Sequence, residues 1–207
     1  MFEPFPKLTR FTHDWIVTEK IDGTNGQVII ANMQDPEQKE RADNAGGVML
    51  HREGDYAVFA GSRNRLLGLG KLDNHGFAQF VKDRAVQFIT LLGEGRHFGE
   101  WYGKGIGPRG YNLPEKRFAL FNAGRWTGVE LPERVDVVPT LFSGFLSDSS
   151  QFDICLAELK QMGSRIAPNF MNPEGIVMYH GPSRTSFKRT FEYDEAGKWA
   201  ENQERKA

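Results

Sequence analysis

The sequence EKIDGTNG, at residues 19–26, most strongly constrains the fold and chemistry of this chain. It follows a predicted strand at 15–19, contains the turn signals Asp-Gly and Asn-Gly, and precedes a predicted strand at 27–31. Lys20 therefore ends a strand beside glycines, where backbone can approach a ligand closely. A lysine becomes a nucleophile once it loses its proton, and nearby cations or a metal ion favour that loss. Asp22 could orient the amine, but a hairpin with a surface lysine fits the same string.

The composition sets limits on the class of protein. The chain has 207 residues, 39% of them hydrophobic, which suits one domain or one compact two-lobed unit. We expect a single domain over 1–207, with a polar tail at 194–207. The net charge of −1 lacks the basic excess of a dedicated nucleic-acid binder, so any such contact must be local or transient.

The single cysteine, Cys155, excludes an intramolecular disulfide and a cysteine-based zinc site. The chain begins without a signal-peptide core and contains no apolar run of membrane-spanning length. These features predict a cytoplasmic protein, a monomer with no membrane partner.

Hydrophobic periodicity and turn signals predict the remaining elements. Residues 48–53 and 56–62 form a predicted hairpin, 32–47 a polar loop, and 76–92 and 150–162 helices. Further strands are expected at 97–102, 117–123, 135–138, 174–179 and 185–191. This order predicts an α+β fold of mostly antiparallel sheets with flanking helices.

Five further strings carry residues suited to binding phosphate, sugar, base or metal: GSRNR (61–65), FGEWYGKGI (98–106), RFALFNA (117–123), PEGIVMYH (173–180) and SFKRTFE (186–192). An arginine fork suits phosphate oxygens, and a carboxylate among aromatics needs a partner such as a ribose hydroxyl or a hydrated cation. Each string alone also fits a structural role, as a solvated turn, an exposed glutamate or a core aromatic.

Together with 19–26, these strings resemble, in the same order, the motifs of ATP-dependent RNA and DNA ligases and messenger-RNA capping enzymes. The resemblance covers roughly residues 15–192. It implies an ATP-grasp-like nucleotidyltransferase fold around a nucleotide cleft, with ATP and Mg²⁺ (or Mn²⁺) as cofactors.

The resemblance also implies roles for individual residues. Lys20 would be adenylylated, with Asp22 and Lys188 as further catalytic residues. Phe121 would stack on adenine, with Phe118 as second choice. Nucleotide contacts are expected at Glu19, Lys20, Asn25, Gly26, Arg63, Glu100, Phe121, Glu174 and Lys188, and metal contacts at Glu174, Asp22 and Glu100. The pattern departs from the family at Thr190, which replaces the second lysine of the last motif.

The branch of the family follows from two features. Only 19 residues follow Lys188, whereas DNA ligases and capping enzymes carry an OB domain there. The Thr-Asn pair at 24–25 also looks more like RNA ligases. The resemblance therefore implies an RNA ligase, bacterial or viral, that joins 5′-phosphate and 3′-hydroxyl ends through lysyl-AMP and an adenylylated 5′ end.

Three alternatives stay open at this point. The chain could seal nicks in DNA or in RNA/DNA hybrids. It could be a nucleotide-binding interaction module with impaired catalysis. It could also adenylylate itself and need a partner chain for sealing.

Overall fold

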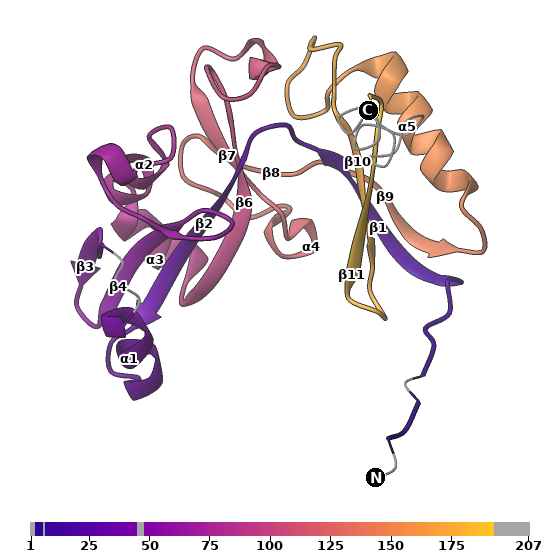
Figure 1. Ribbon diagram of the computed structural model, residues 1–207. Coiled ribbons are helices and arrows are strands. Elements are labelled where there is room, and N and C mark those ends of the chain that lie inside the picture. The colour runs from indigo at the N-terminus through magenta and orange to yellow at the C-terminus, as the bar shows by residue number, and fades with distance from the viewer. Residues whose placement is uncertain (1–2, 6, 45–47, 193–207) are drawn as a thin grey trace, which may run out of the picture. The chain divides into compact units, whose positions relative to one another are not determined.

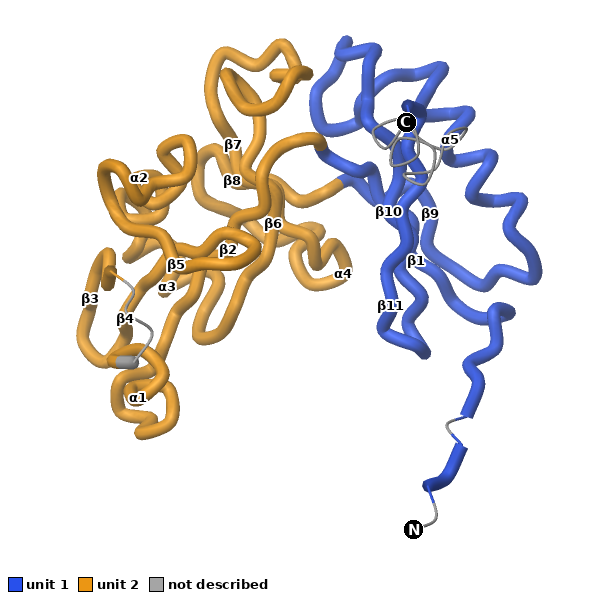
Figure 2. The backbone as a smooth tube through the Cα atoms, viewed as in Figure 1, with its two compact units in different colours: residues 1–21, 139–207 blue, residues 22–138 orange. Residues whose placement is uncertain are grey.

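The computed structural model describes residues 3–5, 7–44 and 48–192 (Figure 1). The predicted polar tail at 194–207 lies outside them. The chain forms two compact units, one of residues 1–21 and 139–207 and the other of residues 22–138 (Figure 2). The boundary falls within the EKIDGTNG string, so that Lys20 belongs to the first unit and Asp22 begins the second.

The first unit contains a four-stranded antiparallel sheet in the order β11-β10-β1-β9, and helix α5 packs on it. In β1, buried side chains alternate with more exposed ones, because successive residues of a strand point to opposite faces. Trp15 and Val17 lie in a core that includes Phe152 and Leu159 of the helix. The elements are β1 His13–Lys20, β9 Thr140–Leu146, α5 Ser150–Met162, β10 Gly175–His180 and β11 Thr185–Thr190.

The second unit is built on a seven-stranded sheet in the order β3-β4-β2-β6-β7-β8, with β5 also paired to β4. Its pairs are antiparallel except for β7 with β8. The strands are β2 Thr24–Asn32, β3 His51–Glu53, β4 Tyr56–Gly61, β5 Leu66–Leu67, β6 Gly95–Gly103, β7 Lys116–Leu120 and β8 Val135–Val137.

Aromatic packing joins helix α2 to one face of this sheet. Phe77 and Phe80 of α2 contact Trp101 of β6, and Phe77 also contacts Phe118 of β7. Because side chains alternate along β2 and β6, Asn25 and Glu100 lie on the opposite face. The helices are α1 Pro36–Asn44, α2 Phe77–Asp83, α3 Ala85–Leu92 and α4 Ala123–Trp126, with 3₁₀ turns η1 Gly70–Leu72 and η2 Gly110–Asn112.

The structure corrects several sequence predictions. The predicted loop 32–47 contains α1, because the Asp35 carboxylate accepts the amides of Glu37 and Gln38 at 2.9 and 3.2 Å and so caps a polar helix. The predicted helix 76–92 is two helices, since the backbone leaves the helical region at Arg84 (φ −116°). Strand β9 and helix α4 were not predicted.

The hairpin interpretation of EKIDGTNG is also wrong. Strand β1 pairs with β9 and β10, whereas β2 pairs with β4 and β6. The string therefore carries the chain from one sheet into the other. In the described part of the chain, no helix combines the length and apolar character that a bilayer crossing requires.

Candidate active site

Lys20 and Glu174 meet in the first unit. Lys20 is the last residue of β1 and stands opposite Gly175, the first residue of β10, so Glu174 directly precedes its strand partner. The Nζ atom of Lys20 donates to Oε2 of Glu174 at 2.6 Å, and the side chains are 21% and 18% exposed. The amine is therefore held in a partly buried ion pair.

Lys188 lies on the same face of this sheet as Lys20. Lys20 stands opposite Gly175 on β10, and Val177, two residues further along, stands opposite Lys188 on β11. Residues two apart in a strand share a face, so both ammonium groups project from one side of the sheet. This face is opposite the one where Ile176 packs in the core with α5. Lys188 itself is exposed.

Glu19 points the other way and is 1% exposed. One carboxylate oxygen accepts the Ser164 hydroxyl at 2.6 Å, and the other accepts the amides of Arg165 and Ile166 at 2.7 and 3.2 Å. Burial raises the pKa of the Glu19 carboxyl, while these hydrogen bonds oppose the rise. The carboxylate thus ties the segment after α5 to β1, and a nucleotide contact would compete with these bonds.

Asp22 is held by two residues of the second unit. Arg109 donates from a terminal nitrogen to Oδ2 of Asp22 at 2.7 Å, and the two side chains are 7% and 19% exposed. The Asp22 amide donates to the Tyr111 hydroxyl at 2.7 Å. The carboxylate is therefore fixed in direction before any ligand binds.

A polar chain links Arg63, Asn25 and Glu100 in the second unit. Arg63 Nε donates to the Asn25 side-chain oxygen at 2.7 Å, and Asn25 Nδ2 donates to Oε2 of Glu100 at 2.9 Å. Asn25 and Glu100 are cross-strand partners on β2 and β6. The 8% exposed carboxylate thus has a partner, and the guanidinium is aimed at the same sheet face.

Gly26 and Phe121 occupy different surroundings. A Cβ atom on Gly26 would lie 2.7 Å from Cζ of Phe77, so glycine is required there for core packing beneath the sheet. Phe121 directly follows β7 and is 43% exposed, whereas Phe118 is fully buried. Of the two predicted stacking candidates, only Phe121 offers an accessible ring.

The carboxylate oxygens of the candidate site are ligands that a divalent metal ion prefers, but they do not surround an ion on all sides. Among the described residues, no three His, Cys, Asp or Glu side chains cluster to hold a metal. Mg²⁺ usually binds through one or two carboxylates together with substrate phosphates and waters, so a cage is not required. Each unit offers partly or fully buried carboxylates of this kind, Glu174 in the first and Asp22 and Glu100 in the second.

Sequence reasoning did not find the partners that position these groups. Arg109 pairs with Asp22 although the two residues are 87 positions apart in the chain. Tyr111 and Ser164 lie 89 and 145 residues from the groups they bind. No local pattern indicates contacts across such separations.

The two sheets and flanking helices confirm the predicted α+β nucleotidyltransferase class. A family model described as RNA ligase matches residues 13–199. The chain belongs to the RNA ligase family.

Solved structures share this fold. The chain is similar to Naegleria gruberi RNA ligase with pyrophosphate, at 19% identity and a TM-score of 0.55, over 86% of this chain and 50% of that one. A variant of the same ligase with ATP and manganese matches at 18% identity and a TM-score of 0.56, over 92% and 52%. The chain spans about half the length of these proteins. No curated protein matches its sequence.

Proposed function

We propose that this chain is the catalytic part of an ATP-dependent, AMP-forming RNA ligase, in which the two units together act as one catalytic domain. The observation that carries the proposal is the Lys20–Glu174 pair, formed at the end of β1 in a chain of this family. A partly buried lysine amine at a strand end is suited to covalent catalysis once the carboxylate releases it.

Lys20 is the proposed nucleophile. Its amine attacks the α-phosphorus of ATP and loses a proton, a nitrogen–phosphorus bond forms, and pyrophosphate leaves. The nitrogen lone pair must face the phosphorus for attack, so the 2.6 Å contact with Glu174 must open first. Glu174 thus has one role in holding Lys20 at rest and a second toward the metal ion.

Lys188 is proposed to neutralise charge on the α-phosphate, and its position on the sheet face of Lys20 supports this role. A fixed cation that faces developing negative charge lowers the barrier more than a mobile one. Thr190 stands where the family's second lysine is expected, so Lys188 carries this role without that neighbour.

The second unit is proposed to bind the nucleoside part of ATP. The Glu100 carboxylate can accept ribose hydroxyls, Arg63 can bind phosphate oxygens, and the exposed ring of Phe121 can stack on adenine. Asp22, fixed by Arg109, would orient the amine or a water on the metal ion.

Mg²⁺ or Mn²⁺ would be held by one or two of the carboxylates of Glu174, Asp22 and Glu100 together with phosphates and waters, and when bound it would neutralise charge on the phosphates. Such oxygen ligands suit either ion. The manganese in structures of the Naegleria ligase belongs to that protein.

The later steps complete the proposed reaction. AMP passes from Lys20 to a 5′-phosphate end, and a 3′-hydroxyl then attacks the activated phosphate and expels AMP. Splitting the reaction in this way is covalent catalysis.

A second candidate is a nucleotide-binding module with impaired catalysis. The replacement of the second lysine by Thr190 and the net charge of −1 favour it. A third, a self-adenylylating enzyme that needs a partner chain, shares all the residues described above.

Joining assays separate these candidates. The chain is incubated with ATP, Mg²⁺ and single-stranded RNA, nicked duplex RNA or nicked DNA, with Lys20→Ala as control. Joined RNA with the wild type alone supports the proposal, and joined DNA only would move the substrate class to DNA. Lysyl-AMP without joined ends on any substrate would favour the partner-dependent enzyme.

A further inference from the structure

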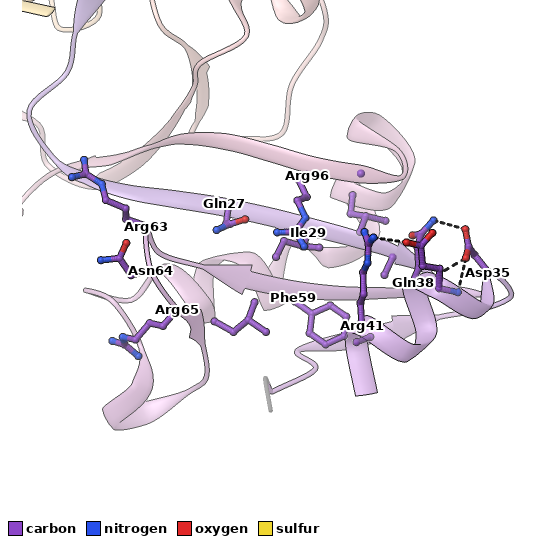
Figure 3. A pocket seen from close by; sticks show the side chains of 16 residues that line it. Gln27, Ile29, Asp35, Gln38, Arg41, Phe59, Arg63, Asn64, Arg65 and Arg96 are labelled. Carbon is purple, nitrogen blue, oxygen red and sulfur yellow. Dashed lines mark hydrogen bonds and ion pairs between the residues drawn. The ribbon is translucent and has the colours of Figure 1, made fainter. Parts of the chain in front are cut away.

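A groove of about 820 Å³ lies in the second unit, on the sheet face that carries Gln27 and Arg63 (Figure 3). Its floor is apolar, with Ile29 of β2 and Phe59 of β4, and α1 forms one wall. Residues Gln27, Ile29, Ile30 and Ala31 of β2 line it, over a length of about 13 Å at the rise of a strand. This is the length that a few nucleotides of one strand occupy at about 3.4 Å each.

Four arginines line the groove. Arg63 and Arg65 lie at one end, Arg96 projects from β6, and Arg41 comes from α1 at the other end (Figure 3). All four are exposed. This arrangement places positive charge along the whole groove although the chain as a whole is close to neutral.

The acidic lining residues are already engaged. Asp35 caps α1, and Glu37 pairs with Arg41 on the next turn. The i,i+4 pair between exposed side chains is weak, so Arg41 can exchange Glu37 for a phosphate at little cost. The groove is thus lined by four guanidinium groups and only two carboxylates, and both carboxylates already bind groups of α1.

Gln27 supplies a second, independent observation. Its Nε2 donates to the Ser62 carbonyl at 2.9 Å, which fixes the orientation of the amide. Within the described residues, its Oε1 is buried and has no hydrogen-bond partner. After a small shift of the residues that cover it, a hydroxyl donor from a ligand, such as that of a ribose, would satisfy this oxygen.

We propose that this groove binds the sugar-phosphate backbone of the polynucleotide, a few nucleotides from the end that reacts. The inference rests on the proposed function. Arg63 lines the groove and also bonds Asn25, so the groove continues directly from the polar chain that ends at Glu100. This continuity favours a nucleic acid over an acidic peptide, which arginines would bind equally well.

The test uses Arg41→Ala/Arg96→Ala and a control of equal charge, Lys39→Ala/Lys82→Ala. The control lysines are exposed but do not line the groove. Binding of a 5′-phosphorylated RNA oligonucleotide is measured by anisotropy without ATP, over a series of salt concentrations. Loss of two phosphate contacts should raise the Kd about tenfold and reduce the slope of log K against log salt by about 1.4. The control should match the wild type.

Other outcomes overturn the proposal. Equal weakening in both variants would show a general charge effect, and unchanged RNA binding would exclude the groove. If Arg41→Ala/Arg96→Ala lost binding of a polyglutamate probe but still bound RNA as the wild type does, the groove would be a peptide-binding surface. Thermal unfolding and lysyl-AMP formation are measured on all variants. A wild type without lysyl-AMP defeats the proposed function, while the binding result still decides the groove.

Discussion

The Nζ atom of Lys20 lies 2.6 Å from Oε2 of Glu174, and the antiparallel register of β1 and β10 brings them together. The residues are 154 positions apart in the chain. Because both side chains are about four-fifths buried, the pair is shielded from much of the solvent that weakens surface ion pairs. This contact excludes a free surface lysine at position 20 and sets the resting state of the proposed nucleophile.

Replacing Glu174 with alanine should suppress lysyl-AMP formation by about a hundredfold and remove its response to Mg²⁺. The substitution removes both the partner of Lys20 and the proposed metal ligand. Labelling with α-labelled ATP over a Mg²⁺ titration measures both effects. Glu158→Ala, at an exposed glutamate of α5, should behave as the wild type. Normal metal-dependent labelling of the Glu174 variant would remove its metal role.

Phe121→Ala should raise the ATP concentration needed for half-maximal labelling by about tenfold, because base stacking contributes about 1–3 kcal/mol. The ring is 43% exposed, so the fold should persist. Phe118→Ala should instead lower the free energy of unfolding by about 3–5 kcal/mol, since this ring is fully buried against Phe77. Circular dichroism and ATP titrations distinguish the two. If Phe118→Ala raises the ATP requirement with its stability intact, the assignment on this strand is wrong.

Arg109→Ala should lower the free energy of unfolding by about 3 kcal/mol, because it leaves the Asp22 carboxylate without its guanidinium partner in a site largely closed to water. Adding Asp22→Asn to this variant removes the uncompensated charge and should recover part of the loss. Urea unfolding of the wild type, both single variants and the double variant gives the coupling energy. Strictly additive losses would show that the pair is not energetically coupled.

His97 should make the protein less stable in mild acid. The imidazole is buried, its Nε2 lies 2.9 Å from the Gly93 carbonyl, and burial lowers the His97 pKa despite this contact. As the pH falls below about 6.5, the unfolded chain binds the proton first, so stability present above that pH is lost. His97→Gln should show a smaller fall in unfolding free energy between about pH 7.5 and about pH 5. His13→Gln, at an exposed histidine, should fall as the wild type does.

Sequence patterns predicted the strand that Lys20 ends and the strands that bear Glu100 and Lys188, because alternating or continuous apolar runs bounded by turns mark strands. Asn25 was predicted in a turn, but it lies in β2. The patterns could not find α1, whose polar sequence has no apolar stripe and depends on the Asp35 cap. Likewise, the apolar residues of 76–92 keep a helical spacing throughout, so the sequence did not indicate that the helix breaks at Arg84.

The order of the motifs identified the candidate site residues, but it did not identify the hydrogen-bond partners and packing neighbours that position them. Glu19 matched a nucleotide-binding position, and its bonds to the segment at 164–166 appear only in the fold. Gly26 also matched the motif, but the structure shows that glycine is needed there because the ring of Phe77 lies directly beneath it. Motifs identify residue types at given spacings, whereas burial and long-range partners depend on tertiary structure.

The most direct test of the central claim is covalent labelling of Lys20. The chain is incubated with α-labelled ATP and Mg²⁺, denatured, and digested, and the labelled peptide is sequenced by mass spectrometry. We expect one AMP on Lys20 in the wild type and no label on Lys20→Ala. An unlabelled wild type, or label on another residue that persists in Lys20→Ala, would contradict it.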